Sequence, residues 1–282
     1  MKVLVTGAAG LLGTEVLRVF GSRHDVTGVD LGDFDIADLA ATSAALSSHR
    51  PDVVVHCAAW SDVDGAESAF EQAFLANAIG AKNVALAAND AGARLIHIST
   101  DYVFDGEAGR PYVESDLPDP TGVYGRSKWM GEQLVREIAD GPTVVRTQAL
   151  YGATGRSFVT AILDRVRAGE PLRVVDDQTV CPTRAADLAE ALLRIATEGT
   201  PGIYHASSRG ECTWFRFAQA ILAKIGNADH PLSPVSSEEF ARPAPRPPYS
   251  VLRNLHLELT IGDTLPHWEE ALGEHLRSEG IA

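Results

Sequence analysis

The first half of the chain alternates short apolar runs with longer stretches in which apolar residues recur every three or four positions. The short runs are rich in valine, leucine and isoleucine, as strands buried on both faces of a sheet require, and Val53-Val54-Val55 is typical of them. The longer stretches have the period of helices that bury one face. Strands that alternate with helices predict a parallel sheet with crossover helices. We expect strands at Lys2–Thr6, Asp25–Asp30, Asp52–His56, Arg94–Ser99 and Thr143–Thr147, and helices at Gly10–Phe20, Leu39–His49, Ala66–Ala91 and Tyr124–Ala139.

The pattern loosens after about Thr147. The proline-rich segment Ala241–Pro248 predicts an extended loop, because proline removes a backbone donor and breaks helices. We expect a large domain over residues 1–150, to which residues 172–199 return, and a smaller α/β part built from residues 151–171 and 200–282. After Thr147 we expect helices at Ser157–Ala168, Arg184–Thr197, Trp214–Ile225 and Pro266–Arg277, and strands at Leu172–Val175 and Gly202–His205.

Composition and charge narrow the class of protein. The 282 residues are 45% hydrophobic and 22% charged, as in an ordinary globular protein. No stretch approaches the roughly 20 apolar residues of a membrane helix, and we expect no export signal at the N-terminus. The net charge of −14 repels nucleic acid and anionic membranes, so neither is an expected partner. Cys57, Cys181 and Cys212 are too far apart for a metal site, which favours reduced thiols and a cytoplasmic location.

A glycine-rich segment, Gly7-Ala8-Ala9-Gly10-Leu11-Leu12-Gly13, directly follows the first expected strand and opens the first expected helix. Glycines there permit a tight turn and close approach of the backbone to a pyrophosphate, and the helix N-terminus supplies partial positive charge. The segment predicts a dinucleotide-binding site in a Rossmann-type sheet. The alternative is a glycine-rich turn without a ligand.

Asp30 closes the second expected strand. A carboxylate there can accept hydrogen bonds from the adenosine ribose hydroxyls and repels a 2′-phosphate, which favours NADH over NADPH. The alternative is a solvated loop aspartate. In the acidic block that follows, Asp35 is the residue expected nearer the adenine.

Tyr124-Gly125-Arg126-Ser127-Lys128 places a phenol and an ammonium four residues apart, on one face of a helix. Free tyrosine has a pKa of about 10, and a nearby cation is expected to lower it toward the range of a general acid and base. Such pairs also occur by chance on solvent-facing helices. Thr100, however, ends the fourth expected strand, where parallel sheets bind ligands, and its hydroxyl can reach a carbonyl oxygen or the tyrosine.

On these motifs the chain resembles the extended short-chain dehydrogenase/reductase superfamily, and within it the dTDP-4-dehydrorhamnose reductase family. The resemblance covers nearly the whole chain. The segment Ser99–Phe104 and the pair Asp177-Gln178 with Pro182-Thr183 are much more specific than the glycine loop. Further matching motifs are His56-Cys57-Ala58-Ala59-Trp60, Val63-Asp64-Gly65-Ala66-Glu67, and Arg246-Pro247 with Ser250 and Leu252.

The resemblance implies an NAD(P)H-dependent reductase of a nucleotide-linked 4-keto-6-deoxy sugar, with a homodimer as a reasonable expectation. It implies that Thr100, Tyr124 and Lys128 are catalytic. The remaining residues fall into two sets. The cofactor is expected to contact Gly7, Gly10, Leu11, Leu12, Gly13, Asp30, Asp35, Ile36, Ala58, Ala59 and Trp60, together with Tyr124 and Lys128; the substrate is expected to contact Thr100, Asp101, Tyr102, Tyr124, Ala149 and Arg246.

One departure from the family concerns the sugar. Typical members carry a tryptophan against the sugar where this sequence has Ala149, so the pocket is expected to be wider there and discrimination between sugars looser. Cys181 is a smaller change beside the same pocket.

Two other functions stay open at this point. One is a sugar-nucleotide epimerase or dehydratase with bound NAD, although Thr100-Asp101-Tyr102 offers no glutamate where a dehydratase uses one. The other is a non-catalytic regulatory subunit of the same fold, against which the intact Thr100, Tyr124 and Lys128 argue. No metal site is expected, and His56 and His97 are interpreted as core histidines.

Overall fold

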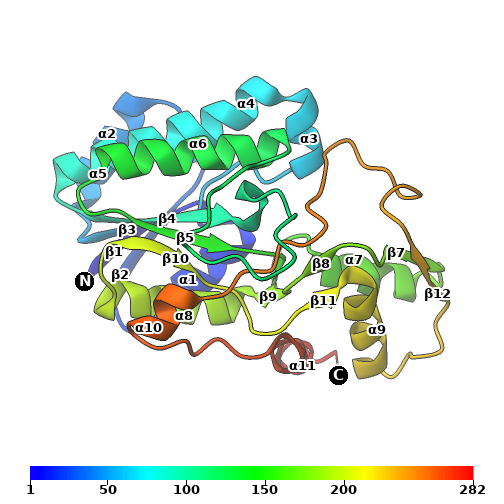
Figure 1. Ribbon diagram of the computed structural model, residues 1–282. Coiled ribbons are helices and arrows are strands. Elements are labelled where there is room, and N and C mark those ends of the chain that lie inside the picture. The colour runs from blue at the N-terminus through cyan, green and yellow to red at the C-terminus, as the bar shows by residue number, and fades with distance from the viewer. Residues whose placement is uncertain (282) are drawn as a thin grey trace.

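The structure is a computed structural model that describes residues 1–281. Within them, six parallel strands form one sheet in the order β10-β5-β4-β3-β1-β2 (Figure 1). The expected α/β class with a doubly wound parallel sheet is therefore confirmed. The strands are β1 (Lys2–Thr6), β2 (Asp25–Val29), β3 (Val53–His56), β4 (Arg94–Thr100), β5 (Thr143–Thr147) and β10 (Gly202–His205).

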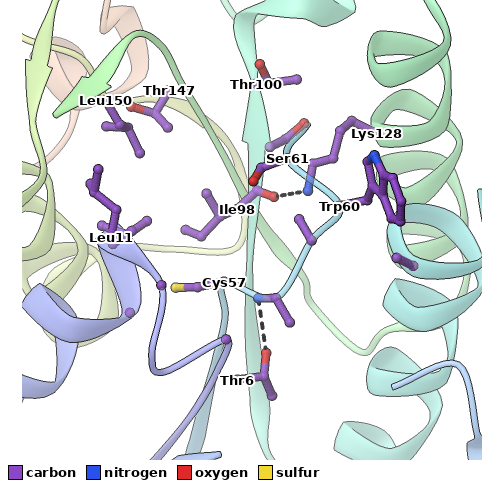
Figure 2. Close-up of a pocket in the computed structure, with 18 of the residues that line it drawn as sticks. Thr6, Leu11, Cys57, Trp60, Ser61, Ile98, Thr100, Lys128, Thr147 and Leu150 are labelled. Carbon is purple, nitrogen blue, oxygen red and sulfur yellow. Dashed lines mark hydrogen bonds between the residues drawn. The ribbon is translucent and has the colours of Figure 1, made fainter. Parts of the chain in front are cut away.

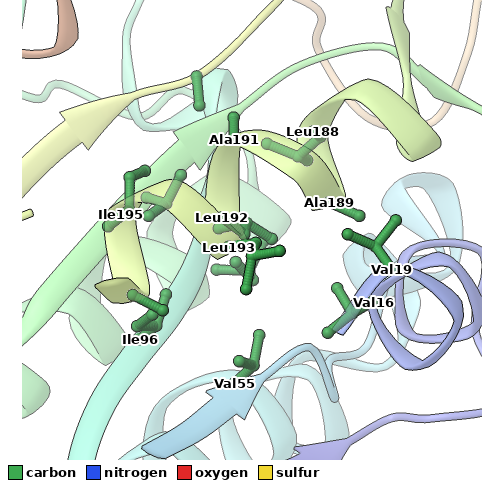
Figure 3. Close-up of a cluster of buried hydrophobic side chains, with 14 of the residues drawn as sticks. Val16, Val19, Val55, Ile96, Leu188, Ala189, Ala191, Leu192, Leu193 and Ile195 are labelled. Carbon is green, nitrogen blue, oxygen red and sulfur yellow. The ribbon is translucent and has the colours of Figure 1, made fainter. Parts of the chain in front are cut away.

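Helices cover both faces of this sheet, because alternate strand residues point to opposite sides. Val3 and Val5 belong to an apolar cluster with α1 (Leu11–Gly21) and α8 (Ala185–Glu198), shown in Figure 3. Leu4, between them, belongs to the cluster on the opposite face. That face is covered by α2 (Leu39–His49), α5 (Ala81–Ala91) and α6 (Val123–Ile138).

The single helix expected over Ala66–Ala91 is wrong, because the segment is broken twice. A short helix, α3 (Val63–Ser68), ends at Ala69, whose φ of −120° and ψ of 48° are not helical. After α4 (Phe70–Phe74), a π-helical turn spans Leu75–Gly80 before α5 begins. An apolar helical period continues through both breaks, so it did not reveal them.

The C-terminal part packs around its own apolar cluster, with α7 (Phe158–Arg167), α9 (Trp214–Lys224) and α11 (Trp268–Ser278). The short helix α10 (Leu255–Leu259) lies against β10. Three small two-stranded sheets complete this part. They pair β7 (Leu172–Val175) with β12 (Leu232–Val235), β8 (Thr179–Val180) with β11 (Cys212–Thr213), and β6 (Leu150–Tyr151) with β9 (Thr183–Arg184).

Two strands do not lie in the part of the protein to which the expected division of the chain assigned them. The strand β10 pairs with β5 in the large sheet, although residues 200–282 were expected outside it. The strand β7 pairs with β12 outside the large sheet, although residues 172–199 were expected to return to it, as α8 does. Sequence order alone does not specify which neighbour a short strand joins. None of the helices described over residues 1–281 is long and apolar enough to cross a membrane.

Candidate active site

A cleft of about 780 Å³ opens at the carboxyl ends of β1, β3, β4 and β5 (Figure 2). This is the edge at which open parallel sheets bind ligands. It brings together residues that lie far apart in the chain and that the sequence singled out. Of the predicted site residues, Gly7, Gly10, Leu11, Leu12, Gly13, Asp30, Asp35, Ile36, Ala58, Ala59, Trp60, Thr100, Asp101, Tyr102, Tyr124, Lys128 and Ala149 line it.

The glycine loop forms one wall of the cleft and leaves no room for side chains. A Cβ added to Gly7 would lie 2.6 Å from the backbone nitrogen of Ala58, and one added to Gly13 would lie 2.1 Å from the Gly7 carbonyl oxygen. Gly7 also has a φ of +68°, which favours glycine. Gly10 precedes the first turn of α1 and has no side chain with which to cap it. The amides of that turn are therefore available to an anion.

Asp30 fastens this loop to the end of β2. One carboxylate oxygen accepts a hydrogen bond from the Ala9 backbone nitrogen at 2.8 Å, and the other accepts from the Leu31 nitrogen at 2.8 Å. The carboxylate is thus held at the cleft wall in a defined orientation. Asp35 also lines the cleft, and its carboxylate accepts from the Ala37 backbone nitrogen at 2.9 Å.

Asn77 holds the opposite wall, and the sequence analysis missed it. Its side-chain oxygen accepts from the Trp60 nitrogen at 2.8 Å, and its amide nitrogen donates to the Trp60 carbonyl at 3.1 Å. The same amide nitrogen donates to the Ser127 hydroxyl at 2.9 Å, on α6, the helix that carries Tyr124 and Lys128. Asn77 lies in the π-helical turn, and a single polar side chain in the apolar run Leu75–Gly80 was the available signal in the sequence.

Thr100 and Asp101 lie where β4 ends. The Thr100 hydroxyl donates to the Asp101 carboxylate at 3.0 Å and accepts from the Tyr102 backbone nitrogen at 3.2 Å. Burial raises the pKa of Asp101 to about 6, although hydrogen bonds from Ser250 and Thr100 oppose the rise. Asp101 is thus a carboxyl group that changes protonation close to neutral pH.

Tyr124 and Lys128 both line the cleft, but the expected effect of the lysine on the tyrosine is wrong for this structure. Burial raises the pKa of Tyr124 to about 12, opposed by hydrogen bonding to the Thr100 side chain. The Lys128 ammonium donates to the Ile98 carbonyl oxygen at 2.7 Å, on the β4 backbone (Figure 2). Burial lowers the pKa of Lys128 to about 8, opposed by the charge of Glu132. Desolvation is the largest cause of both shifts, and each disfavours the charged form.

A buried ion pair lies directly behind these residues. Arg146, on β5, donates from Nη2 to a Glu132 carboxylate oxygen at 2.7 Å, and the two side chains are 1% and 0% exposed. The Ser99 hydroxyl donates to the same carboxylate at 2.5 Å. Ser99 precedes Thr100, and Glu132 lies one turn after Lys128. This network therefore joins β4, β5 and α6 immediately beneath the cleft.

Ala149 has a φ of +45°, in the left-handed region that is uncommon for a residue with a side chain. Its carbonyl oxygen accepts from the Thr183 backbone nitrogen at 3.2 Å, where β6 meets β9. The neighbouring Gln148 is buried, and its side-chain oxygen accepts from the Cys181 nitrogen at 3.0 Å. The predicted small residue thus lies at the cleft, in a backbone conformation that the sequence did not indicate.

Arg246 is the one predicted site residue that lies outside the cleft lining, among the residues described. Its guanidinium pairs with Asp64, with Nη1 to Oδ1 at 2.5 Å and Nη2 to Oδ2 at 3.0 Å. Sequence analysis did not identify Asp64 as its partner, because 182 positions separate them. Lining residues that the sequence analysis also missed include Phe34, Gln148, Leu150 and Arg156.

Comparisons with known proteins agree with this geometry. The model of the family described as RmlD substrate binding domain matches residues 1–280. The dTDP-4-dehydrorhamnose reductase of Mycobacterium tuberculosis is 43% identical over 98% of this chain and 92% of its own length. The dTDP-4-keto-6-deoxy-D-glucose reductase of Streptomyces niveus is 38% identical over 95% of this chain and 94% of its own.

Among solved structures, the dTDP-4-dehydrorhamnose reductase of Bacillus anthracis in complex with NADP superposes with a TM-score of 0.94. It is 37% identical, and the match covers 98% of this chain and 99% of that one. The similarity therefore extends over the sheet, the cleft and the C-terminal part together.

Proposed function

This chain belongs to the RmlD substrate binding domain family, and from that premise we propose which of its residues carry the reaction and which sugar it reduces. It is an NAD(P)H-dependent oxidoreductase that reduces the keto group of a nucleotide-linked 4-keto-6-deoxy sugar. We propose dTDP-4-dehydrorhamnose as the substrate, reduced at C4. The mechanism below rests on the cleft and its hydrogen bonds.

The cofactor fits the wall made by Gly7, Gly10 and Gly13. The glycines at positions 7 and 13 let the loop pack directly against Ala58 and against itself, and the uncapped first amides of α1 are available to the pyrophosphate. Bound NAD(P)H supplies the hydride for reduction. We propose that Leu11, Leu12, Asp30, Asp35, Ile36, Ala58, Ala59 and Trp60 complete this site.

We propose Tyr124 as the proton donor to the carbonyl oxygen of the sugar. With a pKa of about 12, Tyr124 is a neutral phenol at neutral pH and carries the proton that a reduction must supply. Thr100 lies beside it, and we propose that its hydroxyl turns from the Asp101 carboxylate to the carbonyl oxygen when the sugar binds. Lys128, with a pKa of about 8, stays protonated at neutral pH; it holds the nicotinamide ribose and returns the proton to Tyr124 from solvent.

The sugar is proposed to lie between the end of β4 and the C-terminal part. Asp101 and Tyr102 line the cleft at that end, and Ala149 lines it from the turn between β5 and β6. Arg246 borders this region and, paired with Asp64, is proposed to face the nucleotide diphosphate. We also propose that residues 1–150 and 172–199, together with β10, bind the cofactor, and that the rest of the chain binds the substrate. We further propose a homodimer, which analytical ultracentrifugation tests.

The observation that carries the proposal is the convergence of Thr100, Tyr124 and Lys128 on one cleft with the glycine loop. The test is turnover of dTDP-4-dehydrorhamnose with NADH or NADPH by the wild type and by Tyr124→Phe. The variant keeps the ring and loses the proton, so its kcat should fall by the roughly 10²–10⁴-fold typical of general acid catalysis, with cofactor affinity kept. Near-normal turnover by Tyr124→Phe refutes the mechanism. Cofactor binding without reduction by the wild type would instead indicate an epimerase or a regulatory subunit.

A further inference from the structure

A long loop, here called the strap (Ser236–Pro248), follows β12 and runs from the C-terminal part up to α3 before the chain returns to α10 (Figure 1). The second half of the strap is rich in proline, at positions 243, 245, 247 and 248, and proline has no backbone N–H to donate. Near its end, Pro247 and Pro248 press on Gly106, where an added Cβ would lie 2.7 Å from each of them. At the start of the strap, the Asp177 carboxylate accepts from the Ser237 backbone nitrogen at 2.7 Å and from its hydroxyl at 2.6 Å. At its end, the Pro248 carbonyl oxygen accepts from the Thr179 nitrogen at 2.8 Å. The middle of the strap needs a fastening of its own.

One carboxylate, that of Asp64, collects the contacts of the middle of the strap. Asp64, on α3, accepts two hydrogen bonds from Arg246 at 2.5 and 3.0 Å, as two parallel bonds to its two oxygens. It also accepts from Arg242 Nη1 at 3.3 Å and from the Ala244 backbone nitrogen at 3.2 Å. The Arg246 and Asp64 side chains are only 18% and 23% exposed, so solvent screens this pair less than a surface pair.

The same pair touches the wall of the cleft. The Arg246 guanidinium lies close enough to the Tyr102 phenol to oppose the rise in its pKa that burial causes. The Tyr102 ring packs edge-on against Tyr124, with ring centroids 5.7 Å apart. Val63, which precedes Asp64, also lines the cleft. A path of contacts thus runs from the strap through Arg246 and Tyr102 to the proposed proton donor.

A second carboxylate of α3 holds the other side of this junction. The Glu67 side chain accepts from the Val123 backbone nitrogen at 2.8 Å, at the first residue of α6 and next to Tyr124. The helix α3 itself follows the Trp60 segment of the cofactor wall, and the Trp60 indole donates to the Asp62 carbonyl at 3.0 Å. The six residues of α3 therefore contact the Trp60 segment of the cofactor wall, the start of α6 and the strap.

We propose that Asp64 is a positioning residue for the substrate: it anchors the strap and aligns Arg246 and Tyr102, so that the C-terminal part closes the sugar-nucleotide end of the cleft. This rests on the proposed function. Loss of the anchor frees the middle of the strap, which carries Arg246, and weakens binding of the nucleotide sugar. The glycine-loop end, which Asp64 does not touch, keeps its affinity for NADPH.

The test compares Asp64→Asn with the matched control Asp116→Asn. Asp116 also forms a two-bond pair with Arg110, at 2.8 and 2.8 Å, and neither residue lines the cleft or contacts Arg246. Asp64→Asn should raise the KM for the dTDP-4-keto sugar about tenfold, as expected from loss of a charge-assisted pair, with kcat and the NADPH Kd within about twofold of wild type. Asp116→Asn should change none of these. Hydrogen exchange of the Ala244 amide should accelerate in Asp64→Asn only, a readout that needs no turnover.

A double variant tests whether Asp64 acts through Arg246. If it does, Asp64→Asn with Arg246→Gln should be no worse in KM than Arg246→Gln alone, because both changes remove the same contact. Unchanged KM and unchanged Ala244 exchange in Asp64→Asn would overturn the proposal, and so would equal losses of NADPH and sugar-nucleotide affinity. A wild type that reduces no dTDP-4-keto sugar refutes the proposed function instead. In that case, the rate of hydrogen exchange at the Ala244 amide alone decides whether Asp64 anchors the strap.

Discussion

Glu132→Gln keeps the size of the side chain, yet it should lower the free energy of unfolding more than most single substitutions of this kind. The wild-type carboxylate is fully buried and binds Arg146 through Nε at 3.0 and 3.3 Å and through Nη2 at 2.7 Å, with Ser99 Oγ at 2.5 Å. The variant leaves a buried guanidinium without a counter-charge. Breaking a buried pair in this way costs about 3–5 kcal/mol, because the remaining charge stays desolvated. At about 2–4 °C per kcal/mol, Tm should fall by roughly 6–20 °C.

The surface pair Arg253–Glu258 provides a matched control, since its N–O distance is also 2.7 Å while its side chains are 54% and 36% exposed. Glu258→Gln should cost no more than about 1 kcal/mol, because water screens the pair. Urea denaturation followed by circular dichroism gives both values, provided that the slope of free energy against urea stays unchanged. A loss below about 1 kcal/mol for Glu132→Gln would refute the argument from burial.

Three further predictions concern the cleft. Lys128→Ala should weaken NADPH binding. It should also abolish the fall in kcat/KM as pH rises through about 8, since the pKa of Lys128 is about 8 and the side chain carries its proton only below that pH. An unchanged pH profile of kcat/KM and an unchanged NADPH Kd would mean that Lys128 has no role in the reaction. The wild type should show a higher kcat/KM with NADH than with NADPH, because the fixed Asp30 carboxylate repels a 2′-phosphate, so a strong NADPH preference counts against this. Ala149→Trp should sharpen selectivity for dTDP-4-dehydrorhamnose over related keto sugars; a strictly selective wild type, or a variant with unaltered kinetics, contradicts the looser pocket.

The apolar runs in the sequence predicted the strands well, because a strand that is buried on both faces of a sheet consists mostly of consecutive apolar residues. The runs at Lys2–Thr6 and Thr143–Thr147 were predicted to the residue. The break at Ala69 was missed because it depends on how α3 turns toward the strap and α6. Residues far apart in sequence, such as Asp64 with Arg246 or Glu132 with Arg146, meet only after folding.

The chemistry of the site divides in the same way. The four-residue spacing correctly brought Tyr124 and Lys128 to one cleft. It did not indicate that the Lys128 ammonium would bind the Ile98 carbonyl, or that burial would raise the pKa of Tyr124. Spacing along a helix specifies a shared face, whereas desolvation and hydrogen-bond partners depend on the whole surrounding fold.

The packing of α8 on α1 has a consequence for synthesis on the ribosome. The apolar side of α1 joins a cluster that includes Leu188, Leu192 and Ile195, and the edge strand β10 follows later still. A nascent chain that has emerged only to residue 150 therefore exposes that side and an unpaired β5 edge. At about 5–20 residues per second, the wait for α8 lasts roughly 2–10 s. A fragment of residues 1–150 should accordingly aggregate or bind a chaperone, and the dinucleotide-binding half should reach its native state only after most of the chain has been made.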